Sequence, residues 1–204
     1  MIAIIDYGMG NLHSVENALH KLDIECKVTN DARDLMQADK LILPGVGAFP
    51  DCMKNLQASG ILDTLKQEVM EHQKPLLGIC LGMQALFEES EEGAITQGLG
   101  FLKGHIVKMV DPAVKIPHIG WNLLEKQQEF PLFDRLSKEP FVYYVHSYYA
   151  QGYEESDLIG YSQYGCLKIP GLVRHENVLG AQFHPEKSAT DGLAILKYFK
   201  EEFK

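Results

Sequence analysis

A cysteine flanked by glycines is the first feature of this chain that could carry out chemistry. Cys80 lies in residues 78–82 (Gly-Ile-Cys-Leu-Gly), after an apolar run and before a helical pattern. A nucleophile on a sharp strand-to-helix turn needs such small neighbours, because larger side chains would collide with the turn. A helix N-terminus would also favour the thiolate over a free thiol with a pKa of about 8.5. The pattern predicts an activated nucleophile, although a buried cysteine in a glycine-rich turn would have the same local sequence.

A histidine and a glutamate two residues apart form the second feature. His184 and Glu186 follow the apolar run 178–183, and Pro185 restricts the backbone between them. At an extended strand end, residues i and i+2 point to the same side, so the imidazole and the carboxylate can approach each other. The histidine would take the thiol proton and return it to a leaving group, while the glutamate fixes its tautomer. Together with Cys80 this predicts Cys-His-Glu catalysis; no histidine spacing typical of a metal site occurs.

The elements that must position these residues alternate between strand and helix. Residues 2–5 read as a buried strand followed by helical spacing to residue 22, and the order returns at 40–43 with an amphipathic segment at 56–69. It returns again at 75–80, followed by a helix over 81–89. This alternation predicts the α/β class, with a mainly parallel sheet covered by helices on both faces.

The second half of the chain has a different pattern. Between about residues 100 and 180 it carries short β-rich runs, at 104–110, 141–149 and 178–183, which we expect to be antiparallel additions and sheet edges. An amphipathic helix closes the chain. We expect one domain over residues 1–204.

Composition excludes several classes of partner. The chain has 204 residues, of which 46% are hydrophobic, and a formal charge of -9, so a broad attraction to nucleic acid or to anionic lipid is not expected. No apolar run is long enough for a signal peptide or a membrane span, which predicts a cytoplasmic protein. Four cysteines, far apart and without a Cys-x-x-Cys spacing, are expected to be reduced and mostly buried: Cys26, Cys52, Cys80 and Cys166.

Several motifs together resemble a known family. Residues 44–47 (Pro-Gly-Val-Gly), 78–84 and 183–186 occur in the order found in class I (triad) glutamine amidotransferases. More narrowly, the chain resembles the glutaminase subunit of imidazole glycerol phosphate synthase, from Met1 to the last helix. That narrower resemblance rests on residues 6–11, 117–122, 145–148 and 185–188.

The resemblance implies hydrolysis of L-glutamine through a thioester at Cys80. The backbone N–H groups of Leu81 and Val46 would stabilise the oxyanion, because the glycines beside Val46 let its peptide rotate. The alternative is that residues 44–47 form only a tight strand-to-helix turn. The positions that match family residues holding the substrate are Gly47, Gln84, Glu92, Ser147 and Tyr148. Glu92 would bind the α-ammonium group, but it lies in the acidic run 88–92, and such runs are more often solvated helix surface.

The resemblance also implies a partner. In this family a (β/α)8 cyclase subunit receives the ammonia and makes imidazole glycerol phosphate and AICAR in histidine biosynthesis. Trp121, Tyr143 and Lys187 match positions that face it, although packing in the core is the ordinary role of large aromatics. The chain has no phosphate-binding loop and no complete dinucleotide fingerprint, so we expect no cofactor, an acceptor site on another chain, and a heterodimer. We also expect low activity in isolation, with the Val46 peptide moving when the partner is loaded.

Three alternatives remain open. A paralogous glutaminase could serve a synthase that aminates surface sugars. A catalytically inactive chain could act only as a regulatory subunit, which the intact Cys80, His184 and Glu186 speak against. A Cys-His peptide hydrolase is disfavoured because the cysteine surroundings match neither the papain-like nor the caspase pattern.

Overall fold

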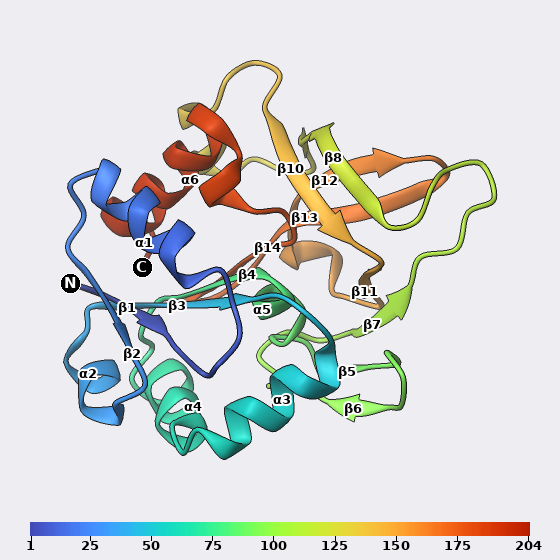
Figure 1. The fold of residues 1–204 in the computed structure, drawn as a ribbon. Helices are drawn as coiled ribbons and strands as arrows, with labels where there is room; N and C mark the ends of the chain where they lie inside the picture. The colour runs from blue at the N-terminus through green and yellow to red at the C-terminus, as the bar shows by residue number, and fades with distance from the viewer.

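A computed structural model describes all residues, 1–204, as helices around three β-sheets (Figure 1). The first half contains β1 (Ile2–Ile5), α1 (Leu12–Lys21), β2 (Cys26–Thr29), α2 (Ala32–Gln37), β3 (Lys40–Gly45), α3 (Phe49–Ala58), α4 (Leu62–Met70), β4 (Leu76–Cys80), α5 (Leu81–Gln84), β5 (Glu89–Ser90) and β6 (Thr96–Gln97). The second half contains β7 (His105–Lys108), β8 (His118–Leu123), β9 (Glu125–Lys126), η1 (Pro131–Arg135), β10 (Phe141–His146), β11 (Tyr148–Gln151), η2 (Glu155–Asp157), β12 (Leu158–Tyr164), β13 (Leu167–His175), β14 (Val178–Ala181), η3 (Pro185–Lys187) and α6 (Ala189–Glu201).

The main sheet has eight strands in the order β2-β1-β3-β4-β14-β13-β12-β9. Neighbours from β2 to β14 pair in parallel, and β13, β12 and β9 continue the sheet in antiparallel fashion. The predicted α/β class with antiparallel additions is therefore confirmed. Strands β4 and β14, which lead to Cys80 and to His184, are direct neighbours at its centre.

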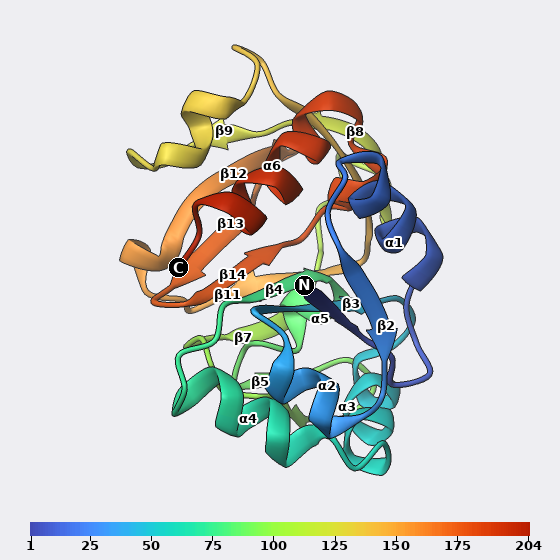
Figure 2. The ribbon, with the colours of Figure 1, turned by 90° about the vertical axis from the view of Figure 1, so that its left-hand side faces the viewer.

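Alternation along β1 explains why helices cover both faces of this sheet. Ile2 and Ile4 pack into one core cluster together with buried residues of α1 and α6, whereas Ala3 and Ile5 pack into a second cluster with residues of α2, α3 and α4. Successive side chains of a strand point to opposite faces, so a continuous apolar run of this kind is buried on both sides. Figure 2 shows the two helix layers, with α1 and α6 on one side and α2, α3 and α4 on the other.

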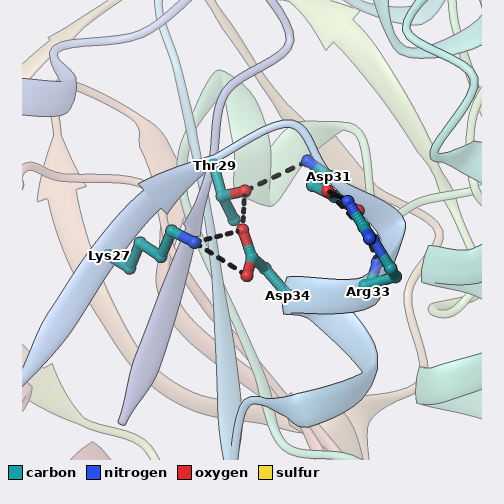
Figure 3. A network of polar contacts seen from close by, with 5 residues as sticks. All are labelled: Lys27, Thr29, Asp31, Arg33 and Asp34. Carbon is teal, nitrogen blue, oxygen red and sulfur yellow. Dashed lines mark hydrogen bonds and ion pairs between the residues drawn. The ribbon is translucent and has the colours of Figure 1, made fainter.

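The short elements β2 and α2 were not predicted, because polar contacts define them more than apolar spacing does (Figure 3). The Asp31 carboxylate accepts the backbone N–H of Arg33 and so caps α2. Thr29 donates its hydroxyl to Asp34 and accepts the Asp31 backbone N–H at 3.0 Å. Lys27 donates to Asp34 at 2.8 Å. This network fixes the chain reversal between strand and helix.

Two predicted helices differ in the structure. The amphipathic segment at 56–69 is divided between α3 and α4, because Gly60 has a φ of +74° that ends the helical path. The helix expected over 81–89 ends at Gln84, and the chain then enters strand β5. The helix that follows Cys80 is therefore a single turn, and the dipole at its N-terminus is correspondingly small.

The β-rich second half forms two smaller sheets beside the main one. Strands β8 and β10 pair as an antiparallel ribbon, with His118 opposite His146 and Trp121 opposite Tyr143. The other sheet has the order β11-β7-β5-β6. The run predicted as one strand at 141–149 is thus two strands in different sheets, separated at Ser147.

The cysteines are less uniformly buried than expected. All four are free; Cys52 and Cys80 are buried, but Cys26 is half-buried and Cys166 is exposed. None of the helices has both the length and the apolar character needed to cross a membrane.

Candidate active site

Cys80 occupies a strained turn between β4 and α5. Its φ is 55° and its ψ is -113°, a conformation that side-chain-bearing residues rarely adopt and that usually persists only where the surroundings enforce it. The flanking glycines allow the close packing that enforces it. A Cβ on Gly82 would lie 1.8 Å from the carbonyl oxygen of Leu43, and one on Gly78 would lie 2.8 Å from the Cα of Met83. The glycine spacing in the sequence thus has a steric reason.

His184 and Glu186 meet just beyond the end of β14. Nδ1 of His184 lies 2.7 Å from Oε1 of Glu186, as the sequence predicted. The reason differs from the prediction, because the strand ends at Ala181 and residues 185–187 form a 3₁₀ turn. Ser188 closes this turn by donating its hydroxyl to the His184 carbonyl at 2.6 Å. The pair is held by a compact turn and not by an extended strand.

Packing from two neighbouring elements fixes that turn. The backbone N–H of His184 donates to the Tyr143 carbonyl at 2.9 Å, and the Tyr143 N–H donates to the Ser188 hydroxyl at 3.0 Å, which ties the turn to β10. On the other side, a Cβ on Gly192 of α6 would lie 2.0 Å from the Pro185 carbonyl oxygen. The position of the imidazole is therefore set by β10 and α6 together.

The electrostatics of His184 favour its protonated form. Burial opposes a charge on the imidazole, but the sulfur of Cys80 and the carboxylate of Glu186 outweigh it and raise the pKa of His184 to about 10. Nδ1 is committed to Glu186, whereas Nε2 has no hydrogen-bond partner within the protein and is therefore left for the Cys80 sulfur. This arrangement favours an imidazolium beside the Cys80 sulfur.

A pocket of about 400 Å³ opens over Cys80 and His184. Every residue predicted from the sequence to bind the substrate or the oxyanion lines it. The pocket-lining residues are Val46, Gly47, Cys80, Leu81, Gln84, Glu92, Pro117, Val145, His146, Ser147, Tyr148 and His184. Gly47 has a φ of +103°, so the turn in front of the cysteine has a backbone conformation that glycine adopts readily.

The acidic run 88–92 is not a solvated helix surface. It contains strand β5, and three of its carboxylates accept backbone N–H groups: Glu88 from Gly104, Glu91 from Lys108 and Glu92 from Phe49. The bond to Glu92 is 2.8 Å long and uses only Oε2. Glu92 is thus a fixed carboxylate at the start of α3 that also lines the pocket.

Three pocket residues had no assigned role in the sequence analysis: Pro117, Val145 and His146. The sequence did contain a signal for these three residues, because residues 117–122 and 145–148 were among the motifs that resemble the family. Their placement depends on the pairing of β8 with β10, which brings residues 28 positions apart into contact.

Two of the residues expected at a partner surface lie on one exposed ribbon. Trp121 is 52% exposed and forms an edge-to-face pair with Tyr143, with ring centroids 6.0 Å apart. The alternative of a core role is wrong for Trp121. Other large apolar side chains of this ribbon are also exposed: Ile119, Phe141 and Val145. Lys187 lies in η3, directly after Glu186.

Comparison with known proteins identifies the family. The model of the glutamine amidotransferase class-I family matches residues 3–202. The chain belongs to the class I glutamine amidotransferases. Among such amidotransferases, it is 51% identical to a protein of Bacillus licheniformis named imidazole glycerol phosphate synthase subunit HisH, over 98% of this chain and 96% of that protein. It is 50% identical to the HisH subunit of Oceanobacillus iheyensis, over 98% of both chains.

Two solved structures share the fold. One, described as a glutamine amidotransferase, superposes with a TM-score of 0.77 at 23% identity over 98% of both chains. A structure of PurLQS from Thermotoga maritima gives a TM-score of 0.72 at 19% identity, over 100% of this chain and 98% of that one. The resemblance to a class I glutaminase, and more narrowly to the glutaminase subunit of imidazole glycerol phosphate synthase, is thereby confirmed.

Proposed function

We propose that this amidotransferase hydrolyses L-glutamine to glutamate and ammonia through a thioester at Cys80, and that a partner subunit receives the ammonia. One observation carries the catalytic part. The buried His184 imidazole contacts the Glu186 carboxylate and lies beside the Cys80 sulfur, at the wall of a pocket that also contains the fixed carboxylate of Glu92.

In the first half of the reaction the Cys80 thiolate attacks the side-chain carbonyl carbon of glutamine. The C–N bond then breaks, the imidazolium of His184 gives its proton to the departing nitrogen, and ammonia leaves. The product on the enzyme is a γ-glutamyl thioester. Glu186 keeps Nδ1 protonated and stabilises the imidazolium, so that Nε2 faces the reacting atoms.

In the second half the neutral His184 takes a proton from water, and the resulting hydroxide attacks the thioester carbonyl. The C–S bond breaks, the new γ-carboxylic acid loses its proton to solvent and leaves as a carboxylate, and the proton that His184 took from water restores the imidazolium–thiolate pair. In both halves the carbonyl oxygen becomes an oxyanion. The backbone N–H of Leu81 and that of the Val46–Gly47 turn are the proposed donors to it.

Substrate recognition rests on the far side of the pocket. Glu92 would bind the α-ammonium group of glutamine with its remaining carboxylate oxygen, because Oε2 already accepts the Phe49 N–H. Gln84, Ser147 and Tyr148 line the same pocket and would complete the contacts to the amino acid.

The proposed partner is a (β/α)8 cyclase subunit, with which this chain forms a heterodimer. Two observations support it: the named HisH subunits share about half of their residues with this chain, and the β8–β10 ribbon exposes apolar side chains beside the pocket. Exposed apolar surface of this kind is typical of an interaction site. Ammonia released into water would become protonated, so a sealed interface at this ribbon would keep it nucleophilic. The products of the whole enzyme would be imidazole glycerol phosphate and AICAR, in histidine biosynthesis.

Partner loading would also regulate the glutaminase. Val46 is 41% exposed and has a glycine on each side, so we expect the peptide that carries its N–H to rotate when the partner is loaded. We expect low activity in isolation and a completed oxyanion hole when the cyclase holds its nucleotide ligand. Full activity of the isolated chain, unchanged by the partner, would refute this regulation.

The test measures ammonia and glutamate released from glutamine by the wild type and by Cys80→Ala, with and without the host's cyclase and its ligand. Cys80-dependent release that rises with the loaded cyclase is the expected result. Ammonia release that is the same with and without the cyclase would support a paralogous partner that aminates sugars. Absence of release under every condition would support an inactive regulatory subunit.

A further inference from the structure

Two buried histidines outside the triad are hydrogen-bonded to each other beside the pocket. His118 of β8 and His146 of β10 are directly opposite in the ribbon, and their Nδ1 and Nε2 atoms lie 3.0 Å apart. Both side chains are almost completely buried, and His146 lines the pocket. The reaction proposed above uses neither of them.

A backbone carbonyl sets the direction of this hydrogen bond. Nδ1 of His146 lies 2.8 Å from the carbonyl oxygen of Tyr148, which can only accept, so Nδ1 carries the proton. In a neutral imidazole Nε2 is then an acceptor, and Nδ1 of His118 must be the donor to it. Nε2 of His118 is in turn an acceptor, with the side-chain nitrogen of Asn122 3.4 Å away. The three N–H donors therefore point the same way, from Asn122 of β8 through the two histidines to the Tyr148 carbonyl.

The environment keeps both rings neutral and in place. Burial lowers the pKa of His118 to about 4 and that of His146 to about 3. The His118 ring is stacked between Tyr144 and Tyr164, with ring centroids 4.5 and 3.9 Å away. Ring rotation and protonation would both disturb this packing, so one tautomer of each histidine is favoured.

The Tyr148 carbonyl also fixes the side-chain amide of Gln84, a residue that lines the pocket. It also accepts from the side-chain nitrogen of Gln84 at 3.0 Å, and that nitrogen donates again to Oε1 of Gln182 at 3.0 Å. Both N–H bonds of the Gln84 amide are therefore used. Its oxygen is the one polar atom of that amide left for the pocket.

We propose that His146, supported by His118, is a positioning residue that fixes the Tyr148 carbonyl and thereby turns the Gln84 side-chain oxygen toward an N–H donor of the bound substrate. This rests on the proposed glutaminase function. Loss of the His146 donor would leave the Tyr148 carbonyl with a single partner, and both that peptide and the Gln84 amide could reorient. The effect would be on the binding of glutamine and not on the chemistry at Cys80.

The first test reads the tautomers directly. In the full-length wild-type protein labelled with ¹⁵N, long-range ¹H–¹⁵N correlation spectra at neutral pH should show His118 and His146 as neutral rings with the proton on Nδ1. A proton on Nε2 of either ring would overturn the proposal. This result does not depend on turnover, so it stands even if the proposed function fails.

The second test compares two substitutions at one position. In His146→Asn the side-chain nitrogen takes the place of Nδ1 and can still donate to Tyr148, whereas His146→Leu has a similar size and no donor. Loss of one hydrogen bond corresponds to about a tenfold change, so His146→Leu should raise KM for glutamine about tenfold with a much smaller change in kcat. His146→Asn should recover most of that loss. An unchanged KM in His146→Leu, or equal impairment of both variants, would overturn the proposal.

Two controls keep the outcomes separable. His13→Leu alters a histidine whose side chain is 93% exposed and should leave KM unchanged. Glutamine binding by Cys80→Ala, with and without His146→Leu, gives a dissociation constant that needs no turnover, and circular dichroism checks that each variant folds. If His146→Leu does not fold, the tautomers of His118 and His146 in the wild type alone test the proposed positioning role. If the wild type releases no ammonia, the glutaminase proposal fails while the tautomers still test the positioning role.

Discussion

Nδ1 of His184 and Oε1 of Glu186 lie 2.7 Å apart, and both side chains are almost completely buried, with 2% and 1% of their surface exposed. In such an environment the carboxylate charge is a main support for the imidazolium, because little water is available to replace it. The second carboxylate oxygen has no hydrogen-bond partner within the protein. The charge of Glu186 is thus directed almost wholly at the histidine.

Removal of that charge should lower both the pKa of His184 and the rate. Glu186→Gln keeps an oxygen within reach of Nδ1 but no longer stabilises the imidazolium, so kcat for glutamine hydrolysis should fall by about a thousandfold or more. The matched control is Glu201→Gln on α6, whose side chain is 53% exposed. Steady-state ammonia release measures the rate, and NMR titration follows the imidazole. A loss smaller than tenfold would contradict the assigned role.

Glu92 should contribute to binding and Glu91 should not. Glu92→Gln preserves an oxygen that accepts the Phe49 N–H but removes the charge proposed to face the α-ammonium group. KM for glutamine should rise by about 10- to 100-fold, the range expected for a hydrogen bond to a charged group. Glu91→Gln is the control, since that carboxylate accepts only the Lys108 N–H. Equal KM values for the two variants would refute the Glu92 assignment.

Gly82 should tolerate no side chain. A Cβ there would lie 1.8 Å from the Leu43 carbonyl oxygen, so Gly82→Ala requires β3 and the Cys80 turn to separate. We expect a loss of about 3 kcal/mol or more in the free energy of unfolding, measured by urea denaturation, or no folded protein. Gly93→Ala is the comparison, because no atom lies within 4 Å of its Cβ position and only the strain of a φ of +75° applies. That variant should lose about 1 kcal/mol.

Trp121 should matter only in the complex. Trp121→Ala removes a large exposed apolar side chain from the β8–β10 ribbon, so partner affinity should fall by about 2 kcal/mol or more while basal ammonia release stays within twofold. Met36→Ala on α2 is the control; Met36 is equally exposed, at 52%, and α2 lies far from β8 in Figure 1. Analytical ultracentrifugation or calorimetry with the cyclase measures the affinity. Unchanged affinity would exclude this face as the interface.

The buried histidine pair should make the protein acid-sensitive. His118 and His146 have folded-state pKa values lowered to about 4 and about 3 from 6.5, so below pH 6.5 the unfolded chain binds protons that the folded chain does not. Each neutral histidine therefore stabilises the folded state above pH 6.5, and this stabilisation is lost as the pH falls toward 4. The free energy of unfolding should fall with a limiting slope of about 1.4 kcal/mol per pH unit for each proton. Urea denaturation between pH 7 and pH 4.5 should show this. His146→Asn should flatten the slope by up to one proton, and an unchanged slope would contradict the neutral assignment.

The amino-acid sequence by itself determined the family and the framework that holds the candidate triad. The glycines two positions before and after Cys80 predict a tight turn with no room for a Cβ atom at either position. The structure shows the reason, because a Cβ on Gly78 or Gly82 would collide with neighbouring backbone atoms. The alternating strand and helix patterns predicted the α/β class, because apolar periodicity within one element reports which of its faces is buried. The motif set also identified the family.

The tertiary structure decided which residues far apart in the chain become neighbours. The sequence predicted that His184 and Glu186 would meet, but the 3₁₀ turn that brings them together depends on packing by β10 and α6. No local pattern indicated that Glu92 caps α3 or that Trp121 is exposed. His118 and His146 meet only through the register of β8 with β10, and this register is set by contacts along the whole ribbon. Local spacing carries information about one element, whereas a site built from several elements depends on how those elements pair and pack.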